Sequence, residues 1–204
     1  MNPPTDYRMF DYNVCLVPNA WIRDQEGTPA IGLSIGYPGW GLLYYAVMSH
    51  LHADRHNVIL EIGTNYGAST IIMAQALIDS NRPGKIITIE RDYATAEIAK
   101  EHFAAAWVND YIRVLVGASR DVIPEIDTRI DIAFIDGSHD CPDVIDDFDN
   151  VLQLLNPGGL MIFDNTTMGG VNQALKIIRD THGGNFVEFP CVSWSPAGIV
   201  FWKR

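Results

Sequence analysis

The chain has 204 residues, of which 48% are hydrophobic and 19% charged, so we expect one globular domain with a substantial core. Its 14 Lys and Arg, scattered singly, against 25 Asp and Glu argue against nucleic acid as a partner. Without an apolar run of ~20 residues, a secretory start or a CxxC pair, the chain is expected to be cytoplasmic, outside membranes and free of disulfides or zinc clusters.

The first part of the chain predicts an irregular lead-in followed by a helix. Residues 1–38 are rich in Pro, Gly and Asn, which favour irregular segments. Residues 39–53 are mostly apolar and free of Pro, which predicts a helix against the core. Trp40 in this helix and Trp194 near the other end of the chain are weak candidates for walls of a substrate pocket, because aromatic residues of this kind more often belong to the core.

After residue 53, strand-like and helical patterns alternate. Near-continuous apolar strands separated by helices are typical of a parallel sheet that is covered on both faces. The strand-like runs are NVILEIG (57–63), KIITIE (85–90), YIRVLVG (111–117), IDIAFID (130–136) and LMIFDN (160–165).

The helical patterns lie between these runs. They cover 67–80 and 93–107, and a further helix follows His139, with Pro142 in its first turn and NPGG at 156–159 after its end. Apolar residues recur at helical spacing in this last helix. Its acidic residues are expected largely on the opposite face: Asp143, Asp146, Asp147 and Asp149.

The last twenty residues follow another pattern. Residues 185–204 hold two apolar runs joined by a turn that contains Ser, Pro and Gly, with no room for a helix. This predicts a hairpin at the end of the sheet, with a final strand antiparallel to the others.

Most of the unusual polar residues end strands of the predicted sheet. An open α/β sheet binds its ligand outside the carboxyl ends of its strands, so these residues point to one edge as the site. They are Glu61, Glu90, Gly117, Asp136 and Asp164.

The turn from Gly63 to Gly67 favours a nucleoside ligand without a pyrophosphate. It lacks the middle glycine of the dinucleotide fingerprint, which disfavours an NAD-type oxidoreductase on a similar sheet. Glu90 ends the second strand, where a carboxylate can accept both hydroxyls of a ribose, and the small residues 117–119 leave space for a flat base. The alternative is that Glu90 is only a solvated strand end and that the glycines merely make turns.

The stretch EIGTNYGAS (61–69) resembles the first motif of class I S-adenosylmethionine-dependent O-methyltransferases, especially those similar to catechol O-methyltransferase. The resemblance continues through Glu90, GAS (117–119), FIDGSH (134–139) and LNPGGLMIFDN (155–165), and covers roughly residues 40–204. It implies a single domain over 1–204 with a Rossmann-like methyltransferase fold: a mostly parallel seven-stranded sheet with an antiparallel last strand and helices on both faces.

The resemblance also implies roles for the residues around the turn. Gly63 and Gly67 would let the methionine part of S-adenosylmethionine pass, Ser69 would bind its carboxylate, and Glu90 would hold the ribose. The full set implied for cofactor binding is Glu61, Gly63, Thr64, Asn65, Gly67, Ser69, Glu90, Arg91, Gly117, Ala118, Ser119 and Asp136.

Asp136, Asp164 and Asn165 close two strands that we expect to be neighbours. Two carboxylates and an amide oxygen are hard ligands of the kind that Mg²⁺ prefers. Strand-end Asp and Asn also cap turns, and the residues alone leave the two readings open. The resemblance favours the metal, since catechol-type enzymes carry the same three residue types here.

His139 lies three residues after Asp136, where the catechol enzymes carry a lysine base and relatives that methylate sugar hydroxyls carry a histidine. A histidine with a pKa near ~6.5 can accept a proton at neutral pH, so His139 is the candidate base. Two alternatives stay open: a loop histidine that only contacts a carboxylate, and a ligand of another divalent metal.

The predicted function is transfer of a methyl group from S-adenosylmethionine to a hydroxyl of a small molecule, such as a sugar, a natural product or a catechol, assisted by a divalent metal. The alternative is a non-catalytic S-adenosylmethionine-binding protein. No NPPY-like motif follows the fourth strand, which argues against nitrogen acceptors. The apolar lead-in and first helix make a homodimer plausible.

Overall fold

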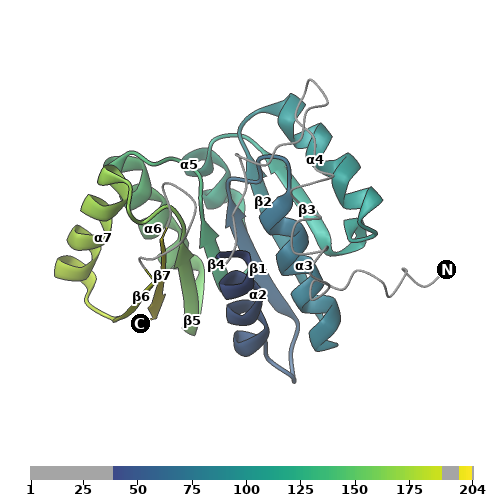
Figure 1. Ribbon diagram of the computed structural model, residues 1–204, viewed down its shortest axis with the longest axis horizontal. Helices are drawn as coiled ribbons and strands as arrows, with labels where there is room; N and C mark the ends of the chain where they lie inside the picture. The colour runs from purple at the N-terminus through teal and green to yellow at the C-terminus, as the bar shows by residue number, and fades with distance from the viewer. Residues whose placement is uncertain (1–38, 190–197, 204) are drawn as a thin grey trace.

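Seven strands form one sheet within residues 39–189 and 198–203, the parts of the chain that the computed structural model describes. Their order is β3-β2-β1-β4-β5-β7-β6, with β1 to β5 parallel (Figure 1). The strands are β1 Asn57–Ile62, β2 Gly84–Glu90, β3 Ile112–Val116, β4 Ile130–Ile135, β5 Leu155–Phe163, β6 Asn185–Phe189 and β7 Ile199–Lys203.

The predicted hairpin is confirmed. β6 pairs antiparallel with β7, and β7 in turn pairs antiparallel with β5, with Met161 opposite Trp202. Trp202 is 1% exposed and its indole N–H donates to the carbonyl of Gly183 at 2.8 Å, which ties the strand to the end of the preceding helix. Trp194, the lead-in 1–38 and the turn between these strands lie outside the described residues.

Helices cover both faces of the sheet, as predicted. α2, α3 and α4 share one apolar cluster, which includes Leu43, Ile72 and Phe103, whereas α6 and α7 lie on the other face with Phe148 and Ile178. The helices are α2 Gly39–His50, α3 Ala68–Ser80, α4 Tyr93–Ala105, α5 Ser119–Val122, α6 Cys141–Leu154 and α7 Gly169–His182, with short 3-10 turns at Asn109–Tyr111 and Ile123–Glu125. No described helix is both long and apolar enough to span a bilayer.

Two element boundaries differ from the predicted ones. The first helix ends at His50 because the side chain of Asn57 binds both main-chain groups of His52, its N–H at 2.7 Å and its carbonyl at 3.0 Å, and so turns the chain into β1. β5 begins at Leu155 rather than at residue 160, since Leu155 already pairs with Ile130 across a register shift in the β4–β5 ladder.

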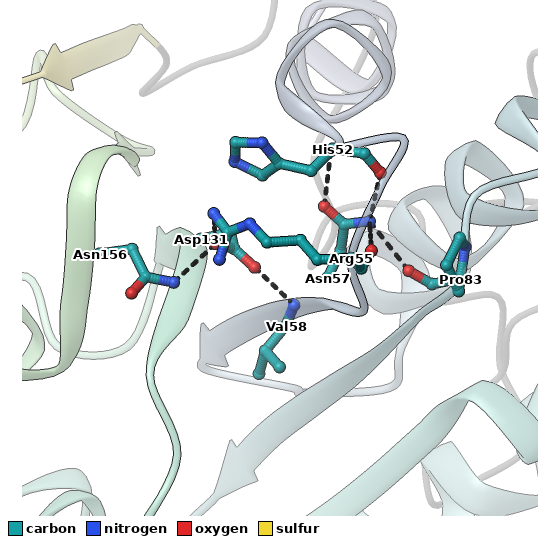
Figure 2. Close-up of polar contacts among 7 residues, drawn as sticks. All are labelled: His52, Arg55, Asn57, Val58, Pro83, Asp131 and Asn156. Atoms are coloured by element: carbon teal, nitrogen blue, oxygen red, sulfur yellow. Dashed lines mark hydrogen bonds and ion pairs between the residues drawn. The ribbon is translucent and has the colours of Figure 1, made fainter.

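A buried polar network closes the edge of the sheet where the parallel strands begin (Figure 2). Asp131, 3% exposed, accepts the main-chain N–H of Val58 at 3.0 Å and the amide of Asn156 at 2.8 Å, and it pairs with Arg55 at 2.6 Å. One carboxylate of β4 therefore joins β1, β5 and the loop before β1. These contacts replace the hydration that the Asp131 carboxylate loses when it is buried.

We expect Asp131→Ala to lower the free energy of unfolding by about 2–4 kcal/mol, because it leaves the Val58 N–H and the Asn156 amide buried without their acceptor. Urea denaturation measures this loss. Asp127→Ala, at an exposed position before the same strand, is the matched control and should change stability by less than about 0.5 kcal/mol. Equal effects of the two substitutions would contradict a structural role for the network.

Candidate functional site

The predicted site residues meet where the strand order reverses. β1 and β4 are neighbours, and the chain leaves them toward β2 on one side and β5 on the other. At such a reversal, open α/β sheets bind their ligands in a crevice at the carboxyl ends of the strands. The ladder continues past the strands, with Asp136 N–H donating to Ile62 O at 2.9 Å and Asp164 N–H to Ile135 O at 3.2 Å. Gly117 N–H likewise donates to the carbonyl of Glu90 at 2.9 Å.

The turn after β1 needs its two glycines for packing as well as for conformation. Gly63 and Gly67 have φ angles of 96° and 90°, a region that glycine adopts without strain. A Cβ on Gly63 would collide with the main-chain oxygen of Asp136, and a Cβ on Gly67 would collide with the ring of Phe103. The turn is therefore pressed against both the end of β4 and helix α4.

Glu61 lies inside the protein, one residue before the end of β1, and its side chain is 0% exposed. Its carboxylate accepts hydroxyl hydrogen bonds from Ser69 at 2.5 Å, from Thr88 at 2.5 Å and from Thr70. Burial raises the pKa of Glu61 to about 7, although the three hydroxyl donors oppose that rise. Because both faces of β1 are covered, Glu61 does not end the strand at the crevice as the sequence analysis expected.

The same cluster fixes what Ser69 and Thr64 offer to a ligand. The hydroxyl of Ser69 is committed to Glu61, and that of Thr64 to Thr88 at 2.5 Å. Both side chains are buried, at 6% and 1% exposure. Main-chain groups of these residues, or a rotated Ser69 hydroxyl, would have to make any contact with a ligand carboxylate.

Glu90, at the end of β2, is held at the crevice by two main-chain donors. Its two carboxylate oxygens accept the N–H groups of Asn65 at 2.8 Å and of Asp92 at 3.0 Å. These contacts orient the carboxylate and still leave acceptor positions for a diol. The neighbouring Arg91 is exposed.

The third predicted strand end carries Gly117, Ala118 and Ser119, which lead into α5. The hydroxyl of Ser119 lies beside the carboxylate of Asp147, a residue of α6 that is 3% exposed. Burial raises the pKa of Asp147 to about 6. Asp147 thus links the predicted base-binding segment to α6.

The expectation that the acidic residues of α6 avoid the core is wrong for Asp147. It lies three residues after Val144 and directly before Phe148, two buried residues of the same helix, so helical spacing places it on the inward face. That spacing was the signal for this residue in the sequence.

Asp136, His139, Asp164 and Asn165 come together at the ends of β4 and β5. The amide N–H of Asn165 donates to Asp136 at 2.9 Å and lies 3.4 Å from Asp164. His139 Nε2 is 3.7 Å from the Asp136 carboxylate and has no partner at hydrogen-bond distance, although this atom is buried. Asn165 adopts a left-handed φ of 54°, a conformation that Asn tolerates better than most residues.

Burial and neighbouring charges shift the pKa values of the ionisable side chains in this group. Burial and the charge of Asp136 raise the pKa of Asp164 to about 7, and burial raises the pKa of Asp136 as well. The Asp136 carboxylate in turn raises the pKa of His139 above its ordinary value. These groups lack a nearby Lys or Arg among the interactions described, in contrast to Asp131 with its Arg55 partner.

This donor set fits a hard divalent cation. Two partly buried carboxylates whose pKa values are raised by burial, and an amide with a free oxygen, would gain from a positive charge between them. Among the described residues, however, no group of three or more His, Cys, Asp or Glu side chains forms a ready metal cluster. Mg²⁺ needs few protein ligands, because it keeps several water ligands of its own.

Trp40, a weak candidate for a pocket wall, is 8% exposed and packs in the core cluster of α2 and α3. Thr70 and Thr88 are not predicted from the sequence, and their hydroxyls reach Glu61 only after folding. No local pattern marks residues of this kind, because their partners are on other elements.

Comparison with known proteins gives a consistent result. The methyltransferase domain family matches residues 60–166, which include the turn, Glu90 and the acidic group. The chain is 31% identical over 150 residues to a catechol O-methyltransferase of Niastella koreensis and 33% identical over 153 residues to the O-methyltransferase imqG of Aspergillus flavus. These matches cover 72% and 71% of this chain but only 63% and 57% of the two relatives.

Solved structures share the fold. The O-methyltransferase TomG of Streptomyces achromogenes, solved with S-adenosylmethionine, has a TM-score of 0.75 at 24% identity, over 92% of this chain and 87% of that one. An O-methyltransferase of Bacillus cereus has a TM-score of 0.71 at 22% identity, over 84% of this chain and 83% of that one.

The buried carboxyl of Glu61 predicts a specific pH dependence of stability. Between about pH 4.5 and pH 7 the unfolded chain loses the Glu61 proton while the folded chain keeps it, so the free energy of unfolding falls as the pH rises through this window. The change attributable to Glu61 is on the order of 3 kcal/mol at most.

Urea denaturation of the wild type and of Glu61→Gln at several pH values from 5 to 8 measures this contribution. The difference between the two proteins should shift in favour of Glu61→Gln as the pH rises and then level off above pH 7. Glu101→Gln, at an exposed position of α4, serves as the control and should give a curve parallel to the wild type. A parallel curve for Glu61→Gln would show that the carboxyl is already ionised at low pH.

Proposed function

The chain belongs to the class I S-adenosylmethionine-dependent O-methyltransferases, and on that premise we propose that it moves the methyl group of S-adenosylmethionine to a hydroxyl oxygen of a small molecule. The observation that carries the proposal is the meeting of the glycine turn, Glu90 and the group around Asp136 at one reversal of the strand order. That arrangement would bring a donor site and an acceptor site into one crevice.

The donor would bind along the turn and the ends of β2 and β3. Glu90 is suited to accept hydrogen bonds from both ribose hydroxyls, because Asn65 and Asp92 already fix its carboxylate. Ala118 and Ser119 would border the base, with Ser119 beside Asp147 of α6. The methionine part would follow Gly63 to Gly67, where main-chain N–H groups at the start of α3 favour a carboxylate.

The acceptor would bind beside the acidic group. Asp136, Asp164 and Asn165 are suited to hold a divalent cation such as Mg²⁺, which when bound would make an acceptor hydroxyl more acidic. The main contribution of the protein is to place the acceptor oxygen in line with the methyl group and the sulfur.

His139 is the proposed base. In the transfer, the acceptor oxygen forms a bond to the methyl carbon, the bond from that carbon to sulfur breaks, and His139 Nε2 takes the hydroxyl proton. This nitrogen is suited to the role because it is buried, has no hydrogen-bond partner and lies 3.7 Å from Asp136, whose charge stabilises the imidazolium that forms. Gly170 at the start of α7 packs against the main-chain oxygen of His139 and so fixes this loop.

Glu90→Ala tests the donor site. We expect a loss of about 2–4 kcal/mol in the binding free energy of S-adenosylmethionine, since a charged acceptor of two hydroxyls is removed together with the anchor of Asn65. Isothermal calorimetry measures it, with Glu101→Ala on α4 as the control that should leave binding unchanged. Unchanged affinity for Glu90→Ala would move the donor site elsewhere.

Asp164→Ala and His139→Ala separate the roles of the acidic group. Asp164→Ala should abolish cation binding, which calorimetry with Mg²⁺ and electron paramagnetic resonance with Mn²⁺ measure. Binding of the donor should stay nearly intact. His139→Ala should keep both kinds of binding but lose roughly 10²–10⁴-fold in kcat, the usual contribution of a positioned base. Part of that loss should return at high pH, where the acceptor hydroxyl ionises without a base.

The control for the base is His52→Ala, an exposed histidine at the opposite edge of the sheet, which should keep full activity. If both His139→Ala and Asp164→Ala keep wild-type rates but melt at lower temperature, these residues only cap the strand ends. Donor binding by the wild type without turnover of any hydroxylated acceptor would instead support the non-catalytic alternative.

A further inference from the structure

Side chains from two other elements hold the turn after β1 at neighbouring residues. On one side, the carboxylate of Glu90 accepts the N–H of Asn65 at 2.8 Å. On the other, His102 Nδ1 lies 2.8 Å from the carbonyl oxygen of Tyr66, across 36 positions in the sequence. Within the turn itself, Gly67 N–H donates to Thr64 O at 2.9 Å.

The second anchor comes from the last turn of α4. His102 is 9% exposed, and the next residue, Phe103, is 2% exposed and fills the space beside Gly67. The end of the helix is itself fixed, because Ala106 N–H donates to His102 O at 2.9 Å and Val108 N–H to Phe103 O at 3.0 Å. A helix end that is held by its own hydrogen bonds therefore contacts the turn through two neighbouring residues.

We propose that His102 is a positioning residue for the methyl donor: its imidazole N–H holds the Tyr66 carbonyl and so keeps the turn in the conformation that receives the donor. The inference rests on the proposed function. Glu90, the other anchor, is also the group proposed to bind the ribose. It would therefore take up new hydrogen bonds when the donor binds. His102 is not among the residues proposed to contact the donor, so its hydrogen bond to the turn would stay in place when the donor binds.

The chemistry of the contact gives a matched set of variants. A carbonyl oxygen only accepts, so His102 Nδ1 must carry the hydrogen. Asn carries an amide N–H at the same number of bonds from Cα as Nδ1, and can therefore replace the donor. Gln keeps the amide but places it one bond further out, and Leu removes the donor while keeping an apolar body in the space.

The experiment measures the dissociation constant of S-adenosylmethionine by calorimetry, KM for the donor, kcat at saturating donor and the melting temperature. His102→Leu and His102→Gln should raise the dissociation constant and KM for the donor by roughly 3- to 10-fold, the effect of one lost hydrogen bond, with kcat at saturation unchanged. His102→Asn should restore wild-type values. If His102→Leu fails to fold, the comparison of Asn with Gln decides.

His50→Leu is the matched control. His50 Nδ1 also lies 3.0 Å from a main-chain oxygen, that of Ala46, near the end of α2, but it has no contact with the turn. It should lower the melting temperature without changing donor affinity. A wild type that binds no donor would overturn the proposed function itself. A wild type that binds donor, with His102→Leu and His102→Gln binding equally well or with His102→Asn failing to restore a lost affinity, would overturn the positioning role alone.

Discussion

The arrangement of the crevice depends on one close approach of main chain to main chain. Gly63 lies so near the carbonyl of Asp136 that no side chain fits between them, and Asp136 N–H continues the ladder from Ile62 O. Because β1 and β4 are central and covered on both faces, neither strand can shift to relieve a clash. The turn that would receive the donor and the loop that carries the candidate base are thus fixed relative to each other by backbone geometry.

The carboxylate of Glu61 and the carboxylates of Asp136 and Asp164 differ in which groups compensate for their lost hydration. Glu61 is surrounded by hydroxyl donors from α3 and β2, which satisfy it without a charge partner. Asp136 and Asp164 have an amide and an imidazole beside them, and the charge of Asp136 disfavours the ionised form of Asp164. Glu61 thus has three hydroxyl donors, whereas the second group leaves the buried Nε2 of His139 without a hydrogen-bond partner. That contrast is a physical reason to assign chemistry to the second group.

The sequence predicts the sheet well, because the sheet follows from local patterns, and the same patterns place the candidate site residues at strand ends. Apolar runs, the change of pattern after residue 184 and the strand-end positions of Glu90, Asp136 and Asp164 are all visible along the chain. The inward position of Glu61 and the contacts of His102 depend on partners 27 and 36 positions away, which no local period records. For Asp147, the helical spacing in the sequence predicts the inward position, but it does not predict that Ser119 of another element lies beside it.

The polar network around Asp131 lies at the edge of the sheet opposite the crevice (Figure 2). It joins three strands at the edge where they begin, while every candidate for donor and acceptor binding is where strands end. The contacts that join the beginnings of these strands are therefore separate from the residues at their ends. A substitution in the loops at the strand ends removes none of the hydrogen bonds around Asp131.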